Sequence, residues 1–220
     1  MTILRWPIET ALTLGDDYRG NQLLAQNISS KGYEAIIAQY VYVTPGDIKN
    51  IFSCIPGAWD AFCGKGLDLG GGVACISSTI GTKPEVESIH CVELTEDVVT
   101  LCHPIVTAAI LKNSKSKVIS VIGDFNRLEI KSNSMDFAVA WGSLHHSYQL
   151  ISTLTECRRV LKPNGHLVVV ERAHNNCTPE SEIDRMLNVK YDEDFLRKTY
   201  RDPNMTLSRR DNGEHEYRYQ

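Results

Sequence analysis

A glycine-rich run and three acidic side chains are the residues of this sequence whose spacing points to ligand binding. Gly70-Gly71-Gly72 directly follows an apolar segment, and Asp68 lies two residues before the first glycine. Because glycine has no Cβ, backbone N–H groups in such a run can approach a bound ligand closely. A glycine-rich run alone is a weak signal, so the acids at Glu93 and Asp124 carry much of the argument.

Glu93 and Asp124 each end an apolar segment of the kind that forms a buried strand. A carboxylate at the end of the second strand can accept hydrogen bonds from both hydroxyls of a ribose. Asp124 is followed by Phe125, so a carboxylate can accept from an adenine amino group while an aromatic ring covers the base. Since the carboxyl ends of parallel strands converge on one crevice, these residues predict an adenosine-binding groove.

The elements that would position these residues alternate between short apolar runs and helical stretches, from about residue 65 to about residue 171. This alternation predicts an α/β fold with a doubly wound, mostly parallel sheet whose strands are covered on both faces. The predicted strands are 66–69, 89–93, 118–122, 137–141 and 166–171. The predicted helices between them are 73–80, 97–111 and 148–161, with a kink or restart at Pro104.

The chain is predicted to form a single domain in three parts. Residues 1–60 form a mostly helical N-terminal cover, in which Thr44 caps a helix that has Pro45 at its first position. Residues 61–171 form the cofactor-binding α/β core. Residues 172–220 form a polar segment with two helices and a hairpin over Met205–Tyr219, where an Asn-Gly pair suits a tight turn.

Composition excludes several classes of protein. With 42% hydrophobic and 23% charged residues, the chain is neither disordered nor collagen-like. Its 23 basic and 27 acidic side chains leave a net charge of −4, which disfavours a nucleic-acid partner.

Membrane, secretory and metal-binding features are also missing from the sequence pattern. The longest stretch without Asp, Glu, Lys or Arg is Phe137–Thr155, which is too polar to span a bilayer. No basic-then-apolar leader follows Met1, so a cytoplasmic protein with no membrane partner is expected. The seven cysteines have no Cys-x-x-Cys or Cys/His metal spacing, and we interpret them as reduced thiols in a protein without a metal site.

Five motifs in order resemble the class I S-adenosylmethionine-dependent methyltransferases. They are Asp68-Leu-Gly-Gly-Gly-Val-Ala74, the acid at Glu93, Gly123-Asp124-Phe125, Met135-Asp136, and the run from Arg158 to Leu167 that contains Lys-Pro-Asn-Gly. Leu144-His145-His146 after the fourth strand makes the small-molecule (type 11-like) group the closest likeness. The resemblance covers about residues 60–171 and implies a Rossmann-like sheet with strand order 3-2-1-4-5.

The resemblance also implies how S-adenosyl-L-methionine would be bound. The aspartate and the glycine loop would hold its amino-acid end, the glutamate its ribose, and the Asp-Phe pair its adenine. Two residues after the fourth strand would lie near the sulfonium. The cofactor-binding residues implied in this way are Asp68, Gly70, Gly71, Gly72, Glu93, Leu94, Asp124, Phe125, Gly142 and Ser143.

His145 and His146 are the candidate catalytic residues. A histidine pair just beyond a strand end could supply a general base that titrates near neutral pH. Alternatively, one ring packs under the cofactor loop and the other hydrogen-bonds a helix terminus. Because the signature recurs with many substrates, the structural role is favoured over base catalysis.

Two departures from the family pattern stand out. Ala74 occupies a position where the family usually has a further glycine, a change that helix packing can absorb. The family also usually continues past the fifth strand to another helix and an antiparallel strand pair. Two alternatives stay open: the hairpin over Met205–Tyr219 replaces those strands, or the sequence stops short of them.

The function implied is transfer of a methyl group to a small-molecule acceptor by in-line displacement, with S-adenosyl-L-homocysteine as product. No Asn-Pro-Pro-Tyr-like run follows Trp141, which argues against a nucleic-acid base or a protein amide as acceptor. The alternatives are a nicotinamide-dependent oxidoreductase, whose Gly-x-Gly-x-x-Gly fingerprint fits less well, and a non-catalytic methyltransferase-like subunit. Any self-association is expected to use the sheet edge or the C-terminal segment.

Overall fold

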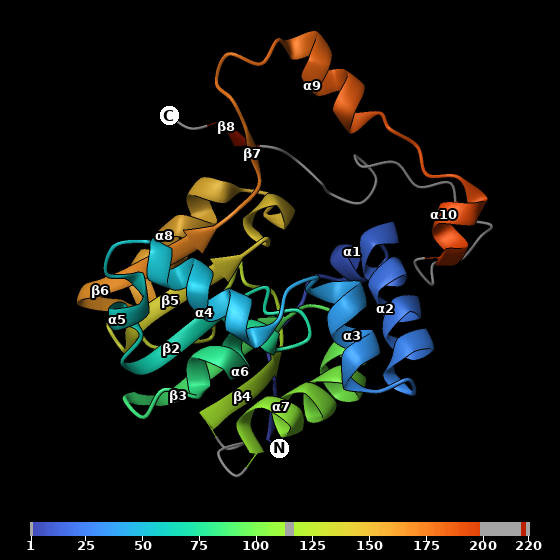
Figure 1. Ribbon diagram of the computed structural model, residues 1–220. Helices are drawn as coiled ribbons and strands as arrows, with labels where there is room; N and C mark the ends of the chain where they lie inside the picture. Colours follow the sequence, from blue (N-terminus) through green and yellow to red (C-terminus); the bar gives the residue numbers. More distant parts are fainter. Residues whose placement is uncertain (1, 113–116, 199–216, 219–220) are drawn as a thin grey trace.

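The computed structural model describes residues 2–112, 117–198 and 217–218 (Figure 1). Its centre is a six-stranded parallel sheet in the order β1-β4-β3-β2-β5-β6. The strands are β1 (Ile3–Arg5), β2 (Gly64–Leu69), β3 (Val86–Glu93), β4 (Val118–Ile122), β5 (Met135–Trp141) and β6 (Leu161–Val170). Strands β2 to β6, numbered along the chain, have the order 3-2-1-4-5, so the predicted fold class is confirmed.

Strand β1 extends the sheet beyond the prediction, which gave the N-terminal residues as helical. It pairs with β4, with Ile3 opposite Ser120 and Arg5 opposite Ile122. A strand of three residues is too short to show an alternating pattern, so periodicity cannot predict it. The helices between β1 and β2 are α1 (Thr10–Thr13), α2 (Asp16–Ser29), α3 (Tyr33–Tyr40), α4 (Pro45–Cys54) and α5 (Ala58–Ala61).

Helix α4 begins where the sequence predicts. The Thr44 side chain accepts a hydrogen bond from the Asp47 backbone N–H, and the Asp47 carboxylate accepts one from the Thr44 backbone N–H. This reciprocal capping box, with Pro45 in the first turn, satisfies N–H groups that would otherwise lack a partner.

The helices that follow the core strands are α6 (Cys75–Gly81), a π-helix η1 (Val98–Cys102) continued by α7 (His103–Leu111), a short 3₁₀ turn η3 (Leu144–His146) and α8 (Leu150–Val160). Pro104 lies in the first turn of α7, so the predicted restart of the helix at this proline is confirmed. The restart takes the form of a change from π to α geometry, which apolar periodicity does not reveal.

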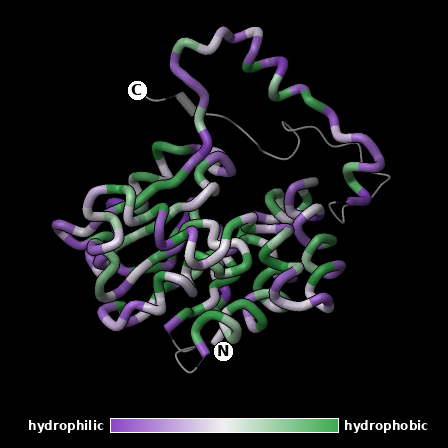
Figure 2. Tube along the Cα trace, in the orientation of Figure 1, coloured by the Kyte–Doolittle hydropathy of each residue, from purple (hydrophilic) through white to green (hydrophobic). Residues whose placement is uncertain are grey.

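The sheet is buried on both faces, and β5 shows how. Phe137 and Val139 pack in a core with helices α2 to α7, whereas Ala138 and Ala140 pack in a second core with α8 and the segment 125–130. Alternate residues of a strand point to opposite faces, so a continuous apolar run serves both cores. Figure 2 shows the hydrophobic positions concentrated in these strands and the helices against them.

After β6 the chain continues through β7 (Ala173–His174), α9 (Glu180–Leu187) and α10 (Glu193–Lys198), and Figure 1 shows α9 standing away from the sheet. The predicted hairpin lies mostly outside the described residues. Its described part, β8 (Tyr217–Arg218), pairs in parallel with β7 rather than with β6. Among the described residues, no helix combines the length and the apolar character needed to cross a membrane.

Candidate functional site

A cavity of about 1010 Å³ lies at the carboxyl ends of β2, β3, β4 and β5. Parts of α1, α2 and the end of α3 line it from the N-terminal side. All the residues singled out as candidates border this cavity. They are Asp68, Gly70, Gly71, Gly72, Glu93, Leu94, Asp124, Phe125, Gly142, Ser143, His145 and His146. Strand ends far apart in sequence meet here because all the strands are parallel and the order in which strands are added to the sheet reverses between β2 and β5.

The glycine loop after β2 is pressed so closely onto the core that two of its glycines leave no room for a side chain. A Cβ added to Gly70, whose φ is +67°, would lie 2.7 Å from the Ser143 Cβ. A Cβ added to Gly71 would lie 2.3 Å from the Cys91 sulfur. The loop backbone therefore forms part of the cavity wall without intervening side chains.

Ala74, at the end of this loop, has a φ of +65° and is fully buried. This left-handed conformation favours glycine, which explains why a glycine suits the position. The alanine methyl packs instead with Cys91 and Leu111, and its burial offsets part of the backbone strain. Packing of the methyl group therefore compensates in part for having alanine rather than glycine at position 74, whereas the strain is in the backbone of the loop.

Asp68 is only 1% exposed, and its Oδ2 accepts a hydrogen bond of 2.6 Å from the Ser77 hydroxyl. Burial raises the pKa of Asp68 to about 6, although the Ser77 hydrogen bonds lower it in part. A carboxylate removed from water in this way gains most from a cationic partner. An ammonium group in the cavity would meet that need.

Glu93 ends β3 and accepts two backbone hydrogen bonds. The Thr95 N–H donates to its Oε1 at 2.8 Å, and the Gly72 N–H donates to its Oε2 at 3.2 Å. Burial raises the pKa of Glu93 to about 7, and the charge of Asp17 adds to the increase, while the backbone donors oppose it. Each carboxylate oxygen can accept more than one hydrogen bond, so the group can still accept from a ligand's hydroxyls.

Asp124 and Phe125 follow the end of β4, the strand that pairs with Glu93's strand β3. The Asp124 Oδ1 accepts from the Asn126 backbone and side-chain nitrogens at 2.8 and 2.7 Å, and its Oδ2 lies 3.4 Å from the Tyr148 hydroxyl. A ring carbon of Phe125 would lie 3.2 Å from a Cβ added to Gly70. The acid and the aromatic ring thus border the cavity together, as a purine would require.

Ser143 and Gly142 connect the end of β5 to its neighbouring strands. The Ser143 hydroxyl donates to the Leu69 carbonyl at 2.5 Å, and the Gly142 N–H donates to the Val170 carbonyl at 2.8 Å. Gly142 has a φ of +56°, and no atom lies within 4 Å of the position of an added Cβ. The backbone at the end of β5 is therefore open to the cavity it borders.

His145 and His146 have different partners, although their ring centroids are 4.1 Å apart. His145 is 2% exposed, and its Nδ1 lies 2.9 Å from Oε1 of Glu171. The Nδ1 of His146, which is about one-third exposed, lies 3.3 Å from Oδ2 of Asp17 in α2. One histidine is therefore anchored within the core, and the other links the core to the N-terminal helices.

Glu171 and Asp17 are site residues that the sequence analysis missed. The pKa of Glu171 lies below its usual value. Burial raises it, but the interactions with His145 and with the backbone N–H groups of Arg172 and Leu144 together lower it by more. An ionised Glu171 makes Nδ1 the proton-bearing nitrogen of His145. Glu171 directly follows β6, and the rule that selected Glu93 would have found it; no local pattern marks Asp17.

The donor set of the cavity suits a nucleoside that also carries an amino acid. The carboxylates of the cavity can accept hydrogen bonds from a ligand's hydroxyl, amino and ammonium groups, and the Phe125 ring lies next to one of these acids. The backbone N–H groups of the glycine loop can donate to a ligand's carboxylate. Within the described ranges, no group of three or more His, Cys, Asp or Glu is placed to hold a metal ion. S-adenosyl-L-methionine matches this set.

Similar proteins of known structure share the fold. The YcgJ protein from Bacillus subtilis is 18% identical with a TM-score of 0.50, and the alignment covers 65% of this chain and 56% of that one. A protein from Galdieria sulphuraria, provisionally described as a sarcosine dimethylglycine methyltransferase, is 21% identical with a TM-score of 0.54, covering 64% and 52%. A protein from Methanococcus maripaludis, provisionally described as an S-adenosyl-L-methionine-dependent methyltransferase, is 19% identical with a TM-score of 0.52, covering 79% and 70%.

This chain spans about half the length of the first two of these proteins. A search of curated proteins finds no match. Residues 67–169, in contrast, match the protein family described as "Methyltransferase domain". The match includes the glycine loop, Glu93, the Asp-Phe pair and both histidines, and it ends near the end of β6. Residues 67–169, a little under half of the chain, therefore match a methyltransferase domain.

Proposed function

We propose that this protein transfers a methyl group from S-adenosyl-L-methionine to a small-molecule acceptor. The observation that carries the proposal is the convergence of Asp68, Glu93 and Asp124, from the ends of three adjacent strands, on one cavity beside the glycine loop. A turn without a ligand would not need to withdraw two of these carboxylates from water and raise their pKa values to about 6 and 7.

The proposed roles follow from the hydrogen-bonding capacity of each group. Asp68 binds the ammonium group of the cofactor, and backbone N–H groups of the loop bind its carboxylate. Glu93 accepts from the ribose hydroxyls, with Leu94 beside it. Asp124 accepts from the adenine amino group, and Phe125 covers the ring. When bound, the cofactor supplies an activated methyl group, whose carbon–sulfur bond breaks as the acceptor's electron pair forms the new bond.

The acceptor is proposed to bind between the core and the N-terminal helices. Tyr18, Asn21 and Tyr40 from α2 and α3 line the same cavity as Gly142 and Ser143 at the end of β5. Much of the rate enhancement then comes from holding the nucleophile in line with the methyl carbon while the surrounding helices exclude water.

Proton removal from the acceptor is proposed to involve His145 rather than His146. With its Nδ1 proton donated to Glu171, His145 keeps a lone pair on Nε2 that can accept a proton. The ionised Glu171 stabilises the imidazolium that forms. An acceptor that is acidic enough to lose its proton unaided does not need this base, and His145 then serves to position the end of β5.

Calorimetric titration with S-adenosyl-L-homocysteine and, separately, NADH tests the proposed cofactor. We expect S-adenosyl-L-homocysteine to bind and NADH not to bind. Binding of NADH alone would support a nicotinamide-dependent oxidoreductase and contradict the proposal. A screen of small metabolites with labelled methyl donor then tests turnover: transfer of label to any acceptor supports an enzyme, whereas tight binding without transfer across amine, hydroxyl and carbon acceptors favours a non-catalytic subunit.

A further inference from the structure

A buried histidine outside the predicted site forms a hydrogen bond with the glycine loop. His103, the first residue of α7, is 0% exposed. Its Nε2 lies 2.8 Å from the Gly72 carbonyl oxygen, and its Nδ1 lies 2.8 Å from the Ser120 hydroxyl in β4. The imidazole therefore bridges the sheet and the loop that borders the cavity.

The chemistry of its partners determines which nitrogen carries the proton. A carbonyl oxygen can only accept, so Nε2–H donates to Gly72, and Nδ1 accepts from the Ser120 hydroxyl. Burial lowers the pKa of His103 to about 4, although the Gly72 hydrogen bond opposes the decrease. The ring is therefore neutral at physiological pH and does not titrate with the acids of the cavity.

The π-helix before His103 accounts for its unusual position. Helix η1 (Val98–Cys102) precedes α7 directly, and both its C-terminal Cys102 and His103 are fully buried. A π turn contains more residues than an α turn, so it changes which side chains point inward, and such turns are frequent at functional sites. Here the change in helix geometry coincides with the residue whose ring reaches the glycine loop.

Gly72 is held at both of its backbone groups. Its N–H donates to the Glu93 carboxylate at 3.2 Å, and its carbonyl accepts from His103. In a trans peptide the C=O and the following N–H point in opposite directions. With the Gly72 carbonyl fixed toward His103, the N–H of Val73 is turned away from that ring, and Val73 borders the cavity.

We propose that His103 is a positioning residue for the cofactor site: by fixing the Gly72 carbonyl, it aims the Val73 N–H at the ligand's carboxylate and keeps Gly72 in contact with Glu93. The inference rests on the proposed function. It adds a neutral histidine, which does not itself line the cavity, to the residues that determine cofactor affinity.

The matched variants His103→Gln and His103→Asn separate positioning from packing. The Gln amide nitrogen can reach the place of Nε2 and donate to Gly72, whereas the shorter Asn side chain can replace only the interaction at Nδ1. Calorimetry should show binding of S-adenosyl-L-homocysteine within about threefold of wild type for His103→Gln, and about 30-fold weaker binding for His103→Asn. Both variants change a buried ring to an amide, so thermal unfolding should show similar losses of stability.

Equal affinities of the two folded variants would overturn the positioning role, because packing alone would then explain His103. If wild type itself does not bind S-adenosyl-L-homocysteine, the proposed function fails and the inference fails with it. Should either variant not fold, NMR of wild-type protein with ¹⁵N-labelled histidine replaces the comparison. We expect a neutral, Nε2-protonated His103 whose Nε2–H signal shifts on ligand binding; an Nδ1-protonated ring or an unchanged signal would refute the inference.

Discussion

Asp68 is one of two buried carboxylates in the proposed cofactor site whose pKa is raised by burial. It is buried with Ser77 as its hydrogen-bond partner, and its pKa rises from 3.8 to about 6. A carboxyl group with a raised pKa in the folded state favours folding while it is protonated. That stability is fully present below the unfolded-state pKa and is lost as the pH rises through the folded-state value. At neutral pH the buried charge of Asp68 therefore lowers the stability of the ligand-free protein, and a bound cation would compensate for it.

Asp68→Asn is expected to stabilise the ligand-free protein at about pH 7.5, by roughly 2–3 kcal/mol. The amide has nearly the same shape, and its oxygen can still accept from Ser77, but it carries no charge to bury. At about pH 5 the wild-type carboxyl is mostly protonated, so the gain should fall to about half. Urea unfolding at both pH values measures this difference.

The same variant should bind S-adenosyl-L-homocysteine at least about tenfold more weakly, because the ammonium group loses its anionic partner. Ser77→Ala is the control, since it removes the hydrogen bond but keeps the carboxylate. Higher stability of Asp68→Asn without loss of affinity would show that the ammonium binds elsewhere.

The two histidines are expected to respond differently to substitution. His145→Gln removes the lone pair that the proposed base needs and should lower the turnover of a weakly acidic acceptor about 100-fold, with cofactor affinity changed little. His146→Gln, the matched control, should leave turnover within about threefold, because His146 pairs with Asp17 rather than with Glu171. Methyl transfer from labelled donor measures both. Comparable turnover in the two variants would assign His145 a structural role.

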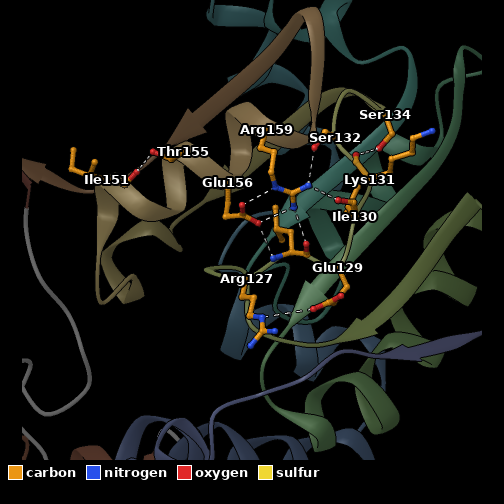
Figure 3. Close-up of polar contacts among 11 residues, drawn as sticks. Arg127, Glu129, Ile130, Lys131, Ser132, Ser134, Ile151, Thr155, Glu156 and Arg159 are labelled. Carbon is orange, nitrogen blue, oxygen red and sulfur yellow. Dashed lines mark hydrogen bonds and ion pairs between the residues drawn. The ribbon is translucent and has the colours of Figure 1, made fainter.

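At the scale of elements, Arg159 of α8 holds the segment between β4 and β5, which contains Asp124 and Phe125. Figure 3 shows its guanidinium among acceptors from that segment. It donates to the Ile130 carbonyl at 2.7 Å and to the Leu128 carbonyl at 2.9 Å, while Glu156 accepts from its Nε at 2.7 Å. A planar guanidinium can satisfy several acceptors at fixed angles, which suits a segment without regular secondary structure.

Arg159→Met is therefore expected to destabilise the fold by about 1–3 kcal/mol, since it leaves the two carbonyls without their charged donor. The exposed neighbour Arg158 is the matched control, and Arg158→Met should change stability by less than about 0.5 kcal/mol. Denaturant unfolding compares the two, and hydrogen exchange should show faster exchange confined to residues 126–133 in Arg159→Met. Equal effects of both variants would mean that Arg159 does not hold this segment.

Elements could be predicted from the sequence where one periodicity persists over enough residues. The five core strands and α8 have such patterns, and the Thr44–Asp47 box marks the start of α4. Strand β1 is too short to show a pattern, and the π geometry of η1 depends on tertiary packing. Strand ends located the acids of the cavity, but Asp17 and His103 contribute through contacts between distant elements, which no local pattern specifies.

At the scale of the whole molecule, the cavity belongs to two parts of the chain that are distant in sequence. The core contributes the strand ends, and the N-terminal helices contribute side chains from α1, α2 and α3. Polar contacts connect α2 to the core near the site: Asp17 pairs with His146, and the Gln26 amide lies 3.4 Å from the Asp97 carboxylate. Both involve partly exposed groups, so each contributes little to stability by itself.

A ligand that fills this cavity should therefore stabilise both parts together. With S-adenosyl-L-homocysteine at about 100 times its dissociation constant, we expect about 2.7 kcal/mol of added stability and a higher melting temperature. Hydrogen-exchange mass spectrometry should show slower exchange in the core segments 68–76 and 93–95 and in the N-terminal segments 11–21 and 40–42, because all four border the cavity. The exposed α8 residues Ile151, Ser152 and Thr155 should change least. Protection of the core segments alone would show that the cofactor contacts only the sheet and would leave the N-terminal helices to the acceptor.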